Sequence, residues 1–258
     1  MIERTNVWSP ELNSYIDINY IIPKNKIDKI MILLHGKIDT DNSKKDIDDF
    51  IDKLELEKLS EKFGVAIAIP LMKNCYYISS EEYRCDNFIA KELPELTRKY
   101  INVSAETQLI LGGVSMGGYG AMLIAAAQAK EFDKVISISG SFIAHDVAIG
   151  DPRIWGELKP DSEEVKDTFI ESFLPLDDIE DNKHKNPIAA LRLLREGMPM
   201  VVLTCGTKEW LYSRNKDLME TLDKLKMRYK FIPIEEGKHE LECFREGLWK
   251  AMKYFRME

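Results

Sequence analysis

The sequence alternates short, continuous apolar runs with longer amphipathic segments, and this alternation restricts the fold more than any other feature. In runs such as 30–34 and 201–203, apolar residues follow one another without a polar interruption. Strands of this kind are covered on both faces, as in a mostly parallel sheet. The pattern predicts seven strands, at residues 14–22, 28–35, 65–70, 107–114, 134–140, 200–206 and 229–236.

Helical patterns separate these runs. They lie at residues 46–63, 85–101, 115–130, 213–227 and 240–255. Pro94 lies within the second pattern, so we expect the helix to bend or break there. Strand–helix alternation predicts a doubly wound α/β sandwich, with helices on both faces of a mostly parallel sheet and the first strand or two antiparallel at one edge.

Residues 141–198 interrupt the alternation with loop residues, short helical stretches and a charged segment. They lie between two strands that we expect to be neighbours. We therefore predict an inserted, cap-like excursion over the carboxyl edge of the sheet, where folds of this type bind ligands. Because the chain contains no internal repeat and no low-complexity linker, we expect residues 1–258 to form a single domain.

Composition excludes several classes of function. The formal net charge of −8 argues against nucleic-acid binding, which requires clustered Lys and Arg. The four cysteines form no CxxC pair and are expected to be reduced thiols. The N-terminus shows no apolar region of a secretory signal, and no run approaches the roughly 20 apolar residues of a membrane span. We therefore expect a soluble, cytoplasmic protein with no membrane partner.

The stretch Gly113-Val114-Ser115-Met116-Gly117 places a serine between a predicted strand and a predicted helix. A serine at so sharp a turn takes a strained backbone conformation, and small residues two positions away avoid clashes. Its hydroxyl would project from the sheet edge as a nucleophile. A glycine-rich turn with a helix-capping serine is the alternative. A phosphate-binding loop is disfavoured, because no Gly-Lys-Ser/Thr ending follows.

A serine nucleophile needs a general base. The four histidines are His35, His145, His184 and His239. In the α/β-hydrolase order the base follows the last strand, which selects His239; a surface histidine that caps the final helix is the alternative. His184 lies in a charged run and His145 in the inserted segment, and neither is expected to take part in catalysis.

The base needs a carboxylate that orients it and stabilises the imidazolium. That acid should follow the strand at 200–206 and precede His239. Glu209 lies three residues beyond Gly206, on a loop, whereas Asp217 falls inside a helical pattern. We therefore predict the triad Ser115, Glu209 and His239, with Asp217 as the alternative acid.

Two backbone N–H groups are expected to form the oxyanion hole. The amide of Met116 begins a helix next to the serine, and His35-Gly36 would bring the amide of Lys37 to the same point. The Lys37 side chain is expected to point into solvent, although attraction of an anionic substrate is an alternative. Four aromatic residues are candidates for the walls of the substrate pocket, with ordinary packing as the alternative: Tyr76, Tyr77, Phe142 and Trp155.

The segments "LLHG", "RCDNFIAKELPELTRKY", "GGVSMGGYGAMLIAA", "KVISISG", "CGTKEWLY" and "GKHELECF" occur in an order that resembles the esterase D-like branch of the α/β-hydrolases. That branch includes tributyrin esterases, acetyl-xylan and feruloyl esterases and S-formylglutathione hydrolases. The resemblance covers about residues 15–255, and "SMGGYGA" is its most specific element. It implies the same nucleophile, base and oxyanion amides. The family usually has Asp where this chain has Glu209, and an aromatic residue where it has Leu241.

These observations predict a serine carboxylesterase that acts on small, short-acyl esters through an acyl-enzyme, with no metal and no cofactor. The expected partner is a small-molecule ester, and the sequence leaves a homo-oligomer open. Two alternatives remain. The acyl group could be transferred to an alcohol, or taken from a thioester, or the fold could serve as a catalytically silent binding protein.

Overall fold

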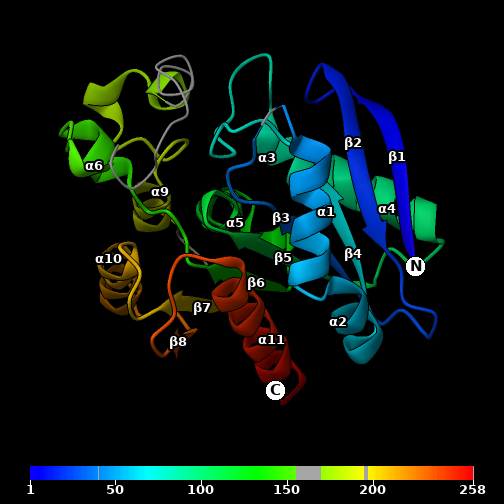
Figure 1. Cartoon of the computed structure of the whole chain (residues 1–258). Helices are drawn as coiled ribbons and strands as arrows, with labels where there is room; N and C mark the ends of the chain where they lie inside the picture. The colour runs from blue at the N-terminus through cyan, green and yellow to red at the C-terminus, as the bar shows by residue number, and fades with distance from the viewer. Residues whose placement is uncertain (40, 155–169, 195–196, 258) are drawn as a thin grey trace.

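The computed structural model describes residues 1–39, 41–154, 170–194 and 197–257. Within them, eight strands form one sheet in the order β1-β2-β4-β3-β5-β6-β7-β8 (Figure 1). The strands are β1 (Ile2–Ser9), β2 (Ser14–Ile21), β3 (Lys29–Leu34), β4 (Val65–Pro70), β5 (Gln108–Val114), β6 (Lys134–Ile138), β7 (Met200–Gly206) and β8 (Tyr229–Ile234). From β4 to β8 all neighbours are parallel, while β2 runs antiparallel to both β1 and β4. The predicted fold class and its antiparallel edge are confirmed.

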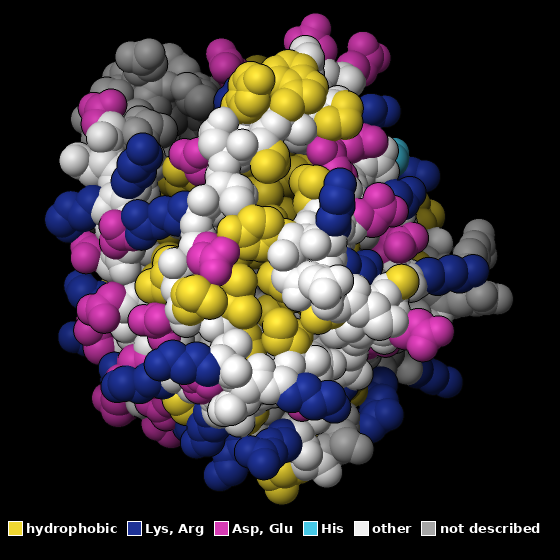
Figure 2. Space-filling model, turned by 90° about the vertical axis from the view of Figure 1, so that its right-hand side faces the viewer, with side chains coloured by type: hydrophobic (Ala, Val, Ile, Leu, Met, Phe, Trp, Pro, Cys, Tyr) yellow, Lys and Arg dark blue, Asp and Glu magenta, His cyan; other side chains and the backbone are white. Residues whose placement is uncertain are grey.

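Strand β1 was not expected. Its residues alternate between exposed and partly buried positions, but polar residues occupy both sets, so the sequence shows no apolar periodicity there. It pairs with β2 along its whole length, from Ile2 opposite Ile21 to Ser9 opposite Ser14. Figure 2 views this side of the molecule, where hydrophobic side chains gather among charged ones. Trp8 and Tyr15, at the tip of the hairpin, are exposed and contact each other edge to face.

Helices cover both faces of the sheet. In front of it in Figure 1 lie α1 (Ser43–Lys53), α2 (Leu56–Phe63) and α11 (Leu241–Met257), which bury one hydrophobic cluster. The helical elements on the other side are α3 (Cys85–Asn87), the π-helical turn η1 (Phe88–Glu92), α4 (Leu93–Ile101), α5 (Met116–Ala127), the 3₁₀ turn η2 (Ala129–Glu131) and α10 (Tyr212–Lys224). A second hydrophobic cluster lies on this other face. Successive residues of β3 point to opposite faces of the sheet, so Ile30 and Ile32 belong to the cluster that contains α5, and Met31 belongs to the cluster that contains α1.

Two predicted helices differ in detail from expectation. The pattern at 46–63 forms two helices, because Glu55 adopts a left-handed conformation (φ 54°) that ends α1 and starts α2. In the pattern at 85–101 the chain stays helical through Pro94, which lies in the first turn of α4. The π-helical turn η1 immediately precedes it, and the widened turn accommodates a residue that has no N–H to donate.

The segment between β6 and β7 is described only in part. It contains α6 (Ala144–Ala148), η3 (Leu176–Asp178) and α9 (Pro187–Leu193), of which α9 packs against α5. Strands β6 and β7 are direct neighbours, so the segment joins two paired strands. No helix within the described ranges is long and apolar enough to cross a bilayer.

Candidate active site

Ser115 stands at the sharp turn between β5 and α5. Its backbone is left-handed (φ 55°, ψ −114°), a conformation that is costly for any residue other than glycine. The turn is held from both sides. The Ser115 N–H donates to the Ile138 carbonyl (2.9 Å), and the Ser115 carbonyl accepts from the N–H groups of Tyr119 (3.0 Å) and Ser141 (3.1 Å). The strained turn therefore fixes the direction of the Ser115 side chain.

The glycines around Ser115 are required by close backbone contacts. A Cβ atom at position 113 would lie 1.9 Å from the Gly117 carbonyl oxygen, and one at position 117 would lie 2.2 Å from that of Leu34. Real Cβ atoms do not approach backbone so closely. Only glycine at both positions lets β3, β5 and α5 meet at this point.

Three residues that are distant in the sequence meet at the carboxyl edge of the sheet. The Ser115 Oγ atom lies 2.9 Å from His239 Nε2, and His239 Nδ1 lies 2.8 Å from Glu209 Oε2. His239 comes from the loop between β8 and α11, and Glu209 from the loop after β7. The structure thus brings together the serine, the base and the first choice of acid that the sequence indicated.

The Glu209 carboxylate is completely buried, and hydrogen bonds saturate it. Besides His239, its Oε1 atom accepts from the Ser139 hydroxyl (2.6 Å), the Gly206 N–H (2.9 Å) and the Cys243 thiol (3.4 Å). Burial alone raises the pKa of Glu209, but the hydrogen bonds, led by that from His239, outweigh it and hold the pKa below its usual value. The carboxylate is therefore ionised at neutral pH.

The other candidate acid and bases lie apart from this cluster. Asp217 is exposed on α10, and the carboxylate next to the imidazole is that of Glu209. His145 is exposed and pairs with Glu180. His184 is exposed as well.

The loop after β3 passes directly beside Ser115. A Cβ atom at Gly36 would lie 3.3 Å from the Ser115 Cβ atom, so glycine permits this approach. The buried His35 ring secures the loop, with Nδ1 2.6 Å from the Gly36 carbonyl and Nε2 accepting from the Met72 N–H (3.0 Å). Because Nε2 is an acceptor, the ring is neutral with its proton on Nδ1. Burial lowers the pKa of His35, which keeps the ring neutral.

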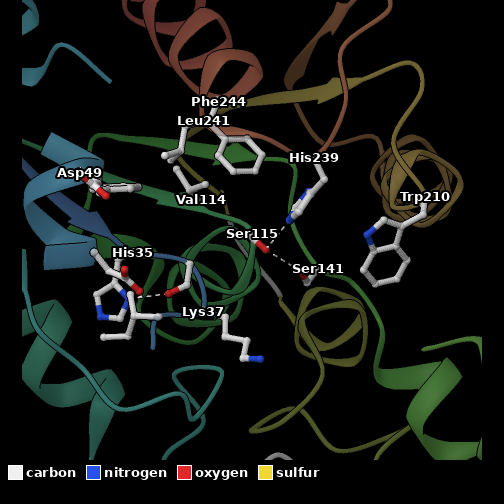
Figure 3. A pocket seen from close by; sticks show the side chains of 14 residues that line it. His35, Lys37, Asp49, Val114, Ser115, Ser141, Trp210, His239, Leu241 and Phe244 are labelled. Carbon is white, nitrogen blue, oxygen red and sulfur yellow. Dashed lines mark hydrogen bonds between the residues drawn. The ribbon is translucent and has the colours of Figure 1, made fainter. Parts of the chain in front are cut away.

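A cavity of about 380 Å³ opens at the Ser115 hydroxyl (Figure 3). Its apolar wall includes Val114, Leu241 and Phe244, and its polar residues include Asp46, Asp49 and Lys37. The Phe244 ring packs edge-on against the imidazole of His239, with ring centroids 4.8 Å apart. Lys37 and Gly36 line the cavity through the loop after β3, and the Lys37 side chain is exposed, as expected.

The aromatic residues proposed for the pocket walls are placed differently. Tyr76, Tyr77 and Phe142 are buried and are not among the residues that line this cavity. Their positions along the chain, just after strand ends, did not reveal that they pack inward: Tyr77 donates to the His35 carbonyl (3.0 Å), and Tyr76 packs against Tyr119. Trp155 lies outside the described residues.

Several lining residues were not anticipated, among them Ser141, Trp210 and Phe244. One signal for Ser141 was available. It follows strand β6, which neighbours β5, and carboxyl ends of adjacent parallel strands converge at one edge. Phe244 and Leu241 belong to the first turn of α11, which follows His239 directly. Across the described residues, no group of three or more His, Cys, Asp or Glu side chains is placed to hold a metal ion.

Comparison with known proteins places the chain in a family. The family model named Esterase matches residues 72–254, which include Ser115, Glu209 and His239. The chain belongs to this esterase family. An acetyl esterase from Caldicellulosiruptor saccharolyticus is 24% identical over 271 residues, a match that covers 98% of this chain and 97% of the relative. As a member of the esterase family, the protein is a serine hydrolase of carboxylic esters.

Solved structures share the fold of this esterase. The fluorophosphonate-binding serine hydrolase F of Staphylococcus aureus superposes with a TM-score of 0.80 at 18% identity, covering 98% of this chain and 97% of its own. An S-formylglutathione hydrolase from the same organism gives 0.78 at 19% identity, with 98% of each chain covered. A ferulic acid esterase gives 0.66 at 16% identity, with 98% of this chain and 97% of the other covered. These similarities establish the α/β-hydrolase fold.

Proposed function

We propose that this esterase hydrolyses small esters with short acyl groups, with Ser115 as nucleophile, His239 as general base and Glu209 as the acid that orients the base. The observation that carries the proposal is the continuous pair of contacts from Ser115 Oγ to His239 Nε2 (2.9 Å) and from His239 Nδ1 to Glu209 Oε2 (2.8 Å). A serine hydroxyl is inert by itself, and a base oriented in this way activates it.

The reaction follows from these contacts. His239 Nε2 takes the Ser115 proton while Oγ forms a bond to the ester carbonyl carbon, and the carbonyl electron pair moves onto the oxygen. When that pair returns, the bond to the alkoxide breaks, and the leaving group takes the proton from Nε2. Water repeats the sequence on the acyl-enzyme and releases the acid. Glu209, ionised and buried, stabilises the imidazolium in both halves. The reaction requires neither metal nor cofactor.

The backbone amides of Lys37 and Met116 are our candidates for the oxyanion hole. Met116 is the first residue of α5, where helix N–H groups have no partner within the helix and the helix dipole favours negative charge. Lys37 follows Gly36, whose close approach to Ser115 brings the loop to the reacting atom. Two such donors stabilise the developing charge, and loss of one typically costs about 10²- to 10³-fold in rate.

The size of the cavity supports a small substrate. Pockets for small molecules typically span about 300 to 1,000 Å³, and the cavity at Ser115 has about 380 Å³ for the acyl and alcohol groups together. Asp46, Asp49 and Lys37 occupy part of its wall, which is unfavourable for a long alkyl chain.

A series of p-nitrophenyl esters from acetate to octanoate tests this assignment. We expect kcat/KM for acetate and butyrate to exceed that for octanoate by about tenfold or more, because the longer chain must place methylene groups against charged walls, at about 0.8 kcal/mol of lost burial each. A preference for octanoate would contradict the proposed short-acyl specificity.

The acyl acceptor is tested in the same assay. An acyl-enzyme can be discharged to an alcohol or a thiol as well as to water. Released acid is therefore measured with and without an added alcohol. We expect free acid as the main product under both conditions; transfer of most acyl groups to the alcohol would identify an acyltransferase.

A further inference from the structure

The Ser115 hydroxyl has a second side-chain partner besides the imidazole. Its Oγ atom lies 3.1 Å from the hydroxyl oxygen of Ser141, which lines the same cavity (Figure 3). Ser141 is 1% exposed, and its own N–H donates to the Ser115 carbonyl (3.1 Å). Ser141, just beyond β6, is therefore joined to Ser115 by a backbone hydrogen bond and by a hydrogen bond between the two hydroxyl groups.

The direction of this hydrogen bond follows from the neighbouring groups. Glu209 accepts the proton on His239 Nδ1, so Nε2 is the unprotonated nitrogen that accepts from the Ser115 hydroxyl. Ser115 has one proton, and it is already donated to Nε2. In the reactive arrangement, the hydrogen between the two serines must therefore come from Ser141.

A tyrosine completes the chain of donors. The Tyr76 hydroxyl is hydrogen-bonded to the Ser141 side chain. Burial raises the pKa of Tyr76, so the phenol keeps its proton throughout the neutral pH range. Tyr76 is 4% exposed, and its ring is fixed against Tyr119 and Phe173. Because the single Ser141 proton is given to Ser115 in the reactive arrangement, the bond between Ser141 and Tyr76 takes its hydrogen from the Tyr76 hydroxyl.

We propose that Ser141 is a catalytic hydrogen-bond donor to the Ser115 oxygen, held in the donating orientation by Tyr76. This proposal rests on the function proposed above. As Ser115 transfers its proton to His239 and attacks, Oγ gains negative charge, and the bond from Ser141 strengthens. In the acyl-enzyme Oγ is an ester oxygen and a poor acceptor. When water displaces it, Oγ again carries charge until His239 returns the proton. Ser141 keeps its own proton throughout.

The expected effect is that of one hydrogen bond to a charged oxygen. Such bonds contribute about 1.5–3 kcal/mol, which corresponds to a tenfold to hundredfold change in rate. The Ser141→Ala variant should lose that factor in kcat/KM for p-nitrophenyl acetate. It should lose a similar factor in the rate constant for labelling of Ser115 by a fluorophosphonate, a reaction that reports the attack alone.

Tyr76→Phe keeps the ring and removes only the donor, so it tests the positioning role. We expect a smaller loss in the same direction, because Ser141 is then free to rotate away. In the double variant, Tyr76→Phe should add nothing to Ser141→Ala, since the phenol acts only through that hydroxyl. Ser60→Ala is the matched control. Its hydroxyl is equally buried and donates to the Val65 carbonyl (2.8 Å), in α2 and outside the cavity lining.

The outcomes separate the inference from the proposed function. If the wild-type protein neither hydrolyses esters nor reacts with the fluorophosphonate at Ser115, the proposed function fails. If the wild type is active and Ser141→Ala retains its full rate in both assays, the donor role of Ser141 is wrong. Additive losses in the double variant would overturn the positioning role of Tyr76. Thermal unfolding of each variant identifies any loss that comes from misfolding. If Ser141→Ala does not fold, the labelling rate of Tyr76→Phe tests the proposal instead, and a rate equal to that of the wild type would contradict it.

Discussion

At the scale of single residues, Glu209 carries a buried negative charge that the site must stabilise. Removing a carboxylate from water is costly unless hydrogen bonds replace hydration. Here Ser139, Gly206 and Cys243 all donate to one oxygen, and the other faces His239. One carboxylate oxygen of Glu209 accepts from the Gly206 N–H, three residues earlier in the chain, while the other reaches the imidazole. The contacts expected of the acid are therefore present.

Glu209→Gln should lower kcat by about 10³- to 10⁴-fold, as loss of the acid does in other serine triads, because an amide neither stabilises the imidazolium nor enforces the tautomer. Asp217→Asn changes an exposed side chain of α10 and should stay within about twofold of wild type. Steady-state kinetics with one p-nitrophenyl ester compares the two. A greater loss in Asp217→Asn would reassign the acid.

We expect the buried His35 side chain to make the stability of the fold depend on pH. Burial lowers its pKa from the usual value near 6.5, so the folded protein binds fewer protons than the unfolded chain once the pH falls below that value. Its contribution is therefore complete above about pH 6.5 and is lost as the pH falls toward the lower pKa of the folded state, by at most about 1.4 kcal/mol per pH unit.

Urea denaturation between pH 7.5 and 5 measures this contribution. The free energy of unfolding should fall with pH in the wild type and fall less steeply in His35→Gln. Equal slopes in the wild type and His35→Gln would show that His35 does not titrate as its burial indicates.

At the scale of elements, the turn from β5 to α5 depends on two glycines more than on any side-chain contact. Gly113 faces the Gly117 carbonyl, and Gly117 faces that of Leu34, so neither tolerates a Cβ atom without a shift of backbone. This explains why a short sequence pattern can indicate a sharp turn between strand and helix at Ser115. Glycine is required at these two positions because the strand and the helix leave no space for a Cβ atom where they approach each other.

Gly117→Ala should destabilise the protein by about 3 kcal/mol or more, because backbone has to move to relieve the clash. Gly197→Ala is the control. A Cβ atom there meets nothing within 4 Å, so the change should stay within about 0.5 kcal/mol. Chemical denaturation of both variants gives the comparison. Similar stabilities for the two would mean that the turn is not closely packed.

The sequence predicted buried elements better than exposed or locally irregular ones. Strands β3 to β7 are almost entirely buried and were found within a few residues, whereas the half-exposed β1 was missed. The break at Glu55 depends on a left-handed backbone at a residue that rarely adopts it, which no local pattern reveals. In the site, the serine, base and acid follow from chain order. Ser141 and the inward packing of Tyr76 depend on tertiary contacts.

At the scale of the whole molecule, the parallel sheet brings separate parts of the chain to one edge. Ser115 and His239 are 124 positions apart, and Glu209 and His239 are 30 apart, yet all three follow strands that end at the same side of the sheet. Hydrophobic clusters on the two faces pack those strands between the helices. A homo-oligomer, a cytoplasmic location and an organisation as a single domain remain predictions.

The most direct test of this account is the activity of Ser115→Ala on p-nitrophenyl acetate, measured beside fluorophosphonate labelling of the wild type. Loss of the nucleophile should lower kcat by about six orders of magnitude, as in other serine triads, while the variant stays folded. The fluorophosphonate should attach to the wild-type protein at Ser115 and leave the variant unlabelled. Full ester hydrolysis by a folded Ser115→Ala protein would contradict the account.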